Sequence, residues 1–87
     1  MSAAMIVNEI NEKIVVEARF EGCLVTPRRF FWDCRRYEVQ EVRKVLRAKS
    51  KDAPCVIFSV TDGDNVYDIR LDQKNLEWRL EKVYMQG

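Results

Sequence analysis

The sequence predicts an all-β protein, mainly antiparallel, with a small, strongly bent sheet or an open barrel of about five strands. Three observations favour this class: runs that alternate apolar and polar residues, β-branched and aromatic residues within those runs, and turn residues at short intervals. With 87 residues, the chain is long enough for one domain and too short for two full sheets. We expect residues 13–87 to form this single β domain and residues 1–12 to be a partly ordered N-terminal extension.

Two strand signals occupy the first half of the chain. In residues 13–20, KIVVEARF, the even-numbered residues are apolar and the odd-numbered ones are mostly polar, as in a half-buried strand. The break EGCLVTP follows. Residues 28–33, RRFFWD, alternate again, and a short connection around Asp33 and Cys34 leads into RRYEVQEV. These segments predict a β-hairpin.

Residues 39–47 allow two interpretations. Tyr37 and Val39 share one face of a strand, whereas Val42 and Leu46 fall on the opposite parity. Either a β-bulge inserts a residue between the two pairs, or the segment forms a short helix, because its apolar residues also fit a helical spacing. We favour the bulged strand, because the segment continues a hairpin arm and no Ser, Thr, Asp or Asn stands before it as a helix N-cap.

The second half of the chain predicts a meander of three strands. PCVIFSVT and NVYDIRLD flank the turn signal DGDN, so we expect an antiparallel hairpin over residues 55–72 with its turn at residues 62–65. The polar turn QKN then introduces the last strand, LEWRLEKVYM. Trp32 and Trp78 stand in phase with apolar neighbours, and both are therefore predicted to be largely buried.

Charge is balanced over the whole chain but not along it. Fifteen Lys and Arg oppose fourteen Asp and Glu, for a net charge of +1. Residues 28–51 nevertheless hold nine Lys or Arg against Asp33, Glu38 and Glu41, interleaved with aromatic residues, as in proteins that bind single-stranded nucleic acid. The alternative is that these arginines lie on the outer face of strands and pair with neighbouring carboxylates. The candidate nucleic-acid-binding residues are Arg28, Arg29, Arg35, Arg36, Arg43, Lys44 and Arg47.

Residue content argues against several chemistries. The chain has no histidine, so imidazole-dependent catalytic triads and most catalytic zinc sites are excluded. Cys23, Cys34 and Cys55 are an odd, widely spaced set without a C-x-x-C pair, which favours reduced thiols over disulfides or a zinc site. DGDN lacks the glutamate and flanking helices of a calcium loop. We therefore expect no enzyme activity, no metal and no cofactor.

No segment has the long apolar run of a membrane helix, and the N-terminus lacks the pattern of a secretion signal, which together predict a cytoplasmic location away from membranes.

The segments FFWDCRRYEVQEV and LEWRLEKVY resemble a small bacterial family described as a domain of unknown function. Its pattern is an aromatic residue, a tryptophan, a short turn, R-R-Y-x-V and a terminal W-x-L-x-x-V-Y. Cys34 stands where that family prefers glycine. The resemblance implies no established activity and no functional site. The matching residues are Phe30, Trp32, Arg35, Arg36, Tyr37, Val39, Trp78, Leu80, Val83 and Tyr84.

The function that we expect is that of a non-enzymatic small β module acting through a macromolecular partner. An open sheet presents strand edges that another chain can extend, which favours protein interaction or self-association. The alternative is a nucleic-acid-binding barrel that uses residues 28–51.

Overall fold

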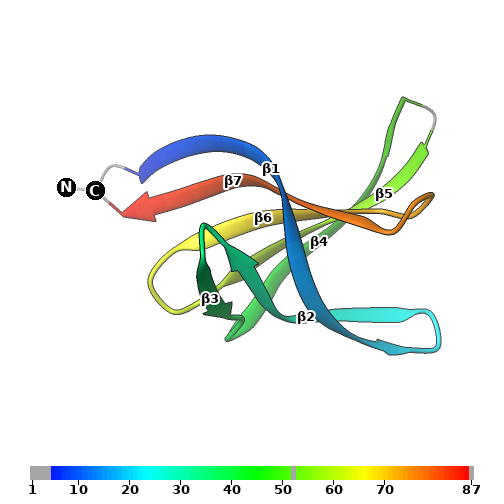
Figure 1. Cartoon of the computed structure of the whole chain (residues 1–87), viewed down its shortest axis with the longest axis horizontal. Coiled ribbons are helices and arrows are strands. Elements are labelled where there is room, and N and C mark those ends of the chain that lie inside the picture. Colours follow the sequence, from blue (N-terminus) through cyan, green and yellow to red (C-terminus); the bar gives the residue numbers. More distant parts are fainter. Residues whose placement is uncertain (1–4, 52, 87) are drawn as a thin grey trace.

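Seven strands form one antiparallel sheet that curls into a half-barrel (Figure 1). This arrangement comes from a computed structural model that describes residues 5–51 and 53–86. The strand order in the sheet is β3-β2-β1-β7-β6-β5-β4, and the described residues contain no helix. The all-β prediction is confirmed, with seven strands where about five were expected. The strands are β1 (Met5–Glu21), β2 (Leu24–Trp32), β3 (Arg35–Glu38), β4 (Glu41–Ser50), β5 (Ala53–Thr61), β6 (Val66–Asp72) and β7 (Glu77–Gln86).

The long strand β1 holds the two parts of the sheet together. Its first half pairs with β7, so that Asn8 lies opposite Val83, and its second half pairs with β2. The expected extension over residues 1–12 is thus wrong for residues 5–12, which belong to the sheet. A register shift between Glu9 and Glu12, where Asn11 has a φ of 52°, interrupts the alternation and hides this strand in the sequence. Residues 1–4 lie outside the described residues.

The β2–β3 hairpin turns on Asp33 and Cys34, as predicted. Trp32 lies opposite Arg35, and the two turn residues have φ values of 53° and 61°, which are typical of a two-residue type I′ turn. This part of the prediction is confirmed.

After β3, the chain passes from pairing with β2 to pairing with β5. Val39 N donates to Arg28 O (2.9 Å) and Gln40 N donates to Thr61 O (2.8 Å), so these two residues link the two ends of the sheet. Beyond them β4 pairs with β5, with a register shift between Val42 and Lys44. Residues 39–47 are therefore an interrupted, bulged strand and not a helix.

The β5–β6 hairpin confirms the prediction for residues 55–72. Cys55 lies opposite Asp72 and Thr61 opposite Val66. In the turn, Oδ1 of Asp62 accepts hydrogen bonds from the backbone N–H groups of Asp64 and Asn65, both at 2.9 Å. This bonding explains why DGDN reverses the chain, because the Asp side chain satisfies the turn's own donors.

The core fills the inner, concave face of the curled sheet. Phe30 is 1% exposed; its ring stacks on Tyr37 at 4.9 Å and meets Tyr67 edge-on at 5.1 Å. Both tryptophans pack against this core, as predicted, although neither is fully buried. Trp32 ends β2 and Trp78 lies near the start of β7, where each strand approaches a turn and fewer neighbours cover it.

In the part of the chain that the structure describes, no helix is long and apolar enough to cross a membrane.

Candidate functional site

The two outer strands, β3 and β4, each leave one edge without a neighbouring strand. β3 has four residues and β4 has ten. An outer strand presents unpaired N–H and C=O groups that a further strand can bind. Because β4 is the longer one, it offers the more extensive edge for such pairing.

Most of the basic side chains on β4 have no carboxylate partner among the residues that the structure describes. Arg43 pairs with Glu41 at 3.4 Å. Lys44, Arg47 and Lys49 are all exposed, and within residues 5–51 and 53–86 none of them has a carboxylate oxygen within 4.0 Å. We refer to Lys44, Arg47 and Lys49 as the β4 cations.

On β2 and β3, two of the four candidate arginines are neutralised. The Arg29 guanidinium bonds to Glu17 on β1 and, at 2.9 Å, to Glu38 on β3. These bonds to Glu17 and Glu38 raise the pKa of Arg29 above its ordinary value. Arg36 also pairs with Glu38, at 3.4 Å. The alternative interpretation of the sequence, in which the arginines pair with carboxylates on neighbouring strands, is therefore correct for Arg29.

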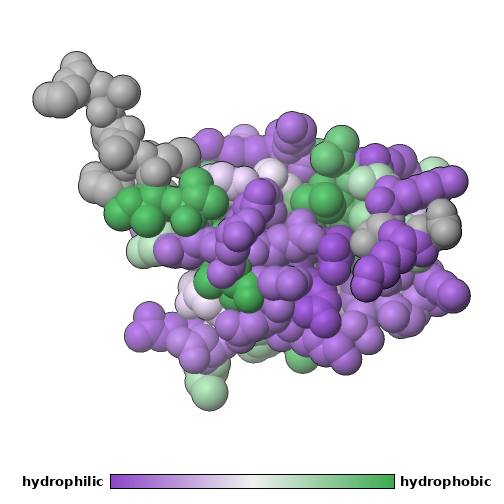
Figure 2. Space-filling view, turned by 90° about the horizontal axis from the view of Figure 1, so that it is seen from above, coloured by the Kyte–Doolittle hydropathy of each residue, from purple (hydrophilic) through white to green (hydrophobic). Residues whose placement is uncertain are grey.

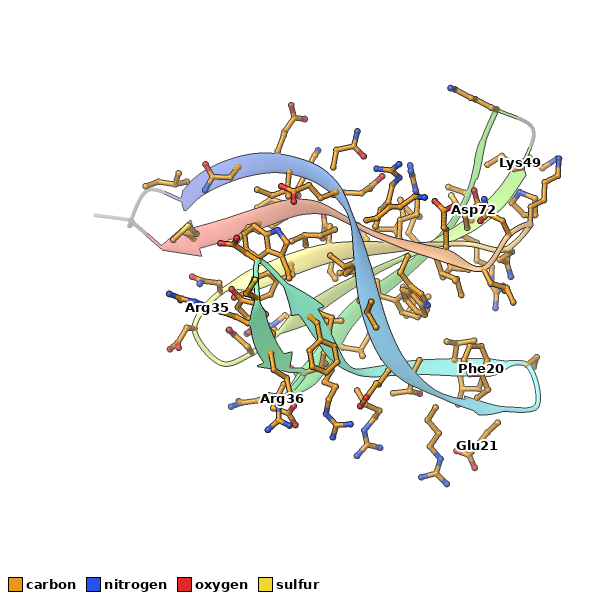
Figure 3. The ribbon with its side chains drawn as sticks, viewed as in Figure 1. Phe20, Glu21, Arg35, Arg36, Lys49 and Asp72 are labelled. Atoms are coloured by element: carbon orange, nitrogen blue, oxygen red, sulfur yellow. The ribbon has the colours of Figure 1, made fainter. Side chains whose placement is uncertain are left out.

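The seven candidate residues do not gather on one surface. Arg28, Arg29, Arg35 and Arg36 belong to β2 and β3, whereas Arg43, Lys44 and Arg47 belong to β4, at the other end of the strand order. In Figure 3, Arg35 and Arg36 lie in the half of the molecule opposite to Lys49, which lies near the end of β4. The charge cluster of residues 28–51 is thus divided between the two edges of the sheet.

The aromatic side chains of the same segment are largely used in packing. Phe30 is buried and stacked on Tyr37, and Trp32 tilts over Tyr37 with its ring centroid 5.9 Å away. Phe31 alone of this group is exposed, at 36%; it lies between Val15 and Arg36, far from β4 in the strand order. The rings and the β4 cations therefore do not form one surface.

Two apolar residues accompany the β4 cations. Val45 is 53% exposed and Leu46 is 47% exposed, between Lys44 and Arg47. Other exposed apolar residues lie in pairs across neighbouring strands, with Ile6 opposite Met85 and Val15 opposite Phe31. Figure 2 shows a mostly hydrophilic face with separate hydrophobic patches. We did not expect Val45 and Leu46 to be functional from the sequence. The only signal in the sequence was the adjacent pair V-L flanked by cations; the outer position of its strand comes from the structure.

The outer face of β6 and β7 forms a wide groove of balanced charge. Arg70 pairs with Glu81 there at 2.8 Å. No three His, Cys, Asp or Glu side chains of the described residues come together in a way that could hold a metal ion. Because its positive and negative charges balance, the groove favours neither an anionic nor a cationic ligand. Its charged residues are Glu9, Lys51, Arg70, Asp72, Glu77, Arg79, Glu81 and Lys82.

Comparison of the chain with family models, with curated proteins and with solved structures finds no match. The resemblance based on the FFWDCRRY and LEWRLEKVY segments therefore stays a prediction.

Proposed function

We propose that this protein is a non-enzymatic binding module that adds an extended, acidic segment of a partner protein to the edge of β4. One observation carries the proposal: a ten-residue outer strand whose exposed Lys44, Arg47 and Lys49 have no carboxylate partner in the described part of the chain. The backbone of β4 would supply hydrogen bonds for affinity, and its cations would select an acidic strand and fix its register.

The distribution of charge favours a different protein over a second copy of this chain. β3 carries Arg35 and Arg36 against Glu38, and β4 carries four cations against Glu41. Both free edges are thus positive, and pairing two such edges brings like charges together. Lysines on an outer strand are a common protection against self-pairing. The same residues attract a strand of opposite charge.

A nucleic-acid partner is less well supported by the same geometry. Single-stranded nucleic acid needs flat rings for its bases beside cations for its phosphates. Phe30 is buried in the core and its ring is stacked on the partly buried Tyr37, and Arg29 and Arg36 are paired with carboxylates. β4 itself carries no aromatic residue beside its cations.

A titration followed by NMR tests the proposal. Acidic peptides as long as β4 are added to the isotopically labelled protein, and the backbone amides of residues 41–49 are expected to shift most. Replacing Lys44→Glu together with Arg47→Glu should weaken binding at least about tenfold. The matched control is Arg35→Glu with Arg36→Glu, which changes the net charge equally at the other edge and should leave the affinity nearly unchanged.

Two results would overturn the proposal. One is the failure of the binding test: either no acidic peptide binds, or both double variants weaken binding equally. Equal weakening would show that only the net charge matters. The other is that single-stranded oligothymidylate binds the parent protein more tightly than the peptides and depends on Lys44 and Arg47, which would establish the nucleic-acid alternative.

A further inference from the structure

We infer that the strand recognised by β4 carries two consecutive apolar residues set among acidic ones. Read from its N-terminus to its C-terminus and paired antiparallel to β4, its residues are acidic, any residue, acidic, apolar, apolar and acidic. This inference rests on the proposed function, because it specifies the partner of the same edge. The pattern of the partner strand follows from the face of the sheet on which each β4 side chain lies and from the residues next to that side chain.

Val45 and Arg47 belong to the inner face. Val45 lies opposite Phe58, which is 2% exposed, and Arg47 lies opposite Val56, which is 6% exposed. Side chains directly opposite one another share a face of the sheet. Val45 therefore extends the core to its rim, where it is left half-covered because β4 has no outer neighbour.

Leu46 and Lys44 belong to the outer face. Leu46 lies opposite Ile57, and Lys44 lies opposite Ser59. These side chains line a shallow hollow of about 230 Å³. The carboxylate of Asp68 in this hollow is already bonded, to Ser59 Oγ at 2.5 Å and to Tyr84 Oη at 2.9 Å. Glu81, which pairs with Arg70, and Lys82 also line the hollow. The hollow thus offers an arriving strand an apolar wall and the Lys44 ammonium, which has no carboxylate partner among the described residues.

A strand added beside β4 places each side chain about 4.5–5.5 Å from the one opposite. Apolar side chains opposite Val45 and Leu46 would cover both, one on each face, because successive residues alternate between faces. Acidic side chains opposite Lys44, Arg47 and Lys49 would pair with the β4 cations. The adjacency of Val45 and Leu46 is the reason that the partner needs two consecutive apolar residues.

The bulge of β4 limits the length of this pattern. The register shift between Val42 and Lys44 leaves Arg43 out of the regular pairing, so regular strand geometry begins at Lys44. The pattern therefore covers the six positions opposite residues 44–49. Antiparallel addition is the more stable geometry per residue, and it sets the order given above.

Three peptides of identical composition test the inference. The first contains Glu-Thr-Glu-Val-Ile-Glu, the second has this segment reversed, and the third separates the apolar residues as Glu-Val-Glu-Thr-Glu-Ile. The first should bind at least about tenfold more tightly than the other two. Leu46→Ser should remove most of this preference. Val15→Ser is the matched control, because Val15 is an exposed apolar residue of β1 and should not matter.

The outcomes separate this inference from the proposed function. Equal binding of the three peptides, with no effect of Leu46→Ser, would overturn the pattern while leaving acidic edge pairing in place. Tighter binding of the reversed segment would overturn the antiparallel order. Failure of all three peptides to bind would overturn both. Thermal melts of each variant, expected to match the parent because Leu46 and Val15 are exposed, exclude unfolding as the cause.

Discussion

Several residues of this small protein adopt backbone conformations that L side chains disfavour. Asp33 and Cys34 form the β2–β3 turn with positive φ, and Leu76 has a φ of 58° just before β7. Such a conformation costs a residue other than glycine roughly 1–2 kcal/mol. Each of these residues lies at a reversal of the chain, where the pairing of the flanking strands fixes the turn.

Replacing Cys34→Gly should stabilise the fold by about 1 kcal/mol, because glycine adopts the φ of 61° without steric strain. Urea unfolding measures this change. Cys34→Ala is the control, since it removes the thiol but keeps the Cβ atom, and it should give no gain. A glycine variant no more stable than the alanine variant would contradict the assignment of strain to this residue.

The hydroxyl group of Tyr67 is linked to a turn carboxylate. It donates to Asp62 Oδ2 at 2.8 Å, and Tyr67 is 2% exposed. Burial and the nearby Asp62 carboxylate raise the pKa of Tyr67 to about 12. Burial alone would raise the pKa of Asp62, but the N–H groups of Asn65 and Asp64 and the Tyr67 hydroxyl lower it below its ordinary value.

The raised pKa of Tyr67 predicts a loss of stability in alkali. The contribution of this group is complete below pH 10.0, its ordinary pKa, and is lost as the pH rises towards about 12. The loss should be on the order of 2 kcal/mol. Tyr67→Phe should lose less stability over the same interval, and its phenolate absorbance should lack the component that titrates near pH 12. Identical alkaline titrations of parent and variant would contradict this prediction.

Among the elements, the strands differ in what holds them. β3 has only four residues, but Tyr37 stacks on Phe30 and Glu38 binds the Arg29 guanidinium. Exposed ion pairs of this kind contribute only about 0–1 kcal/mol. The aromatic contact, which joins Tyr37 to the buried Phe30, is therefore the stronger reason that β3 stays in place.

Phe30→Ala should destabilise the protein by about 3–5 kcal/mol, because it removes a buried ring that touches both Tyr37 and Tyr67. Trp78→Ala should cost clearly less, although the removed side chain is larger, because Trp78 is only half-buried. Urea midpoints of the two variants measure the difference. If Trp78→Ala were the more damaging change, Trp78 would be more important to the core than its burial indicates.

At the scale of the whole molecule, the positive charge of both sheet edges controls association. The balanced total charge of the chain conceals this arrangement, because the acidic residues lie mainly outside β3 and β4. Like charges at the free edges oppose edge-to-edge pairing of two copies.

We expect the protein to be monomeric in sedimentation experiments at low ionic strength, where repulsion between the edges is least screened. Adding an acidic peptide that matches β4 should give a complex with one protein copy. A dimer at low salt that disappears when β4 is altered by Lys44→Glu and Arg47→Glu would contradict this prediction.

The sequence by itself determined the strand class, the hairpin over residues 55–72, the turn at Asp33 and Cys34 and the bulged strand after Tyr37. These features depend on residues close in sequence, since alternation and turn chemistry act locally. The structure corrected the extent of β1, because its bulge near Asn11 breaks the alternation that marks a strand.

Only the tertiary structure decided which charges are free. Arg29 and Arg47 look alike in the sequence, yet strand pairing places Glu17 and Glu38 beside Arg29 and leaves Arg47 on an open edge. Val45 and Leu46 likewise become a candidate surface only because β4 is the last strand of the sheet. Strand order joins residues far apart in the chain, and local propensity does not determine that order.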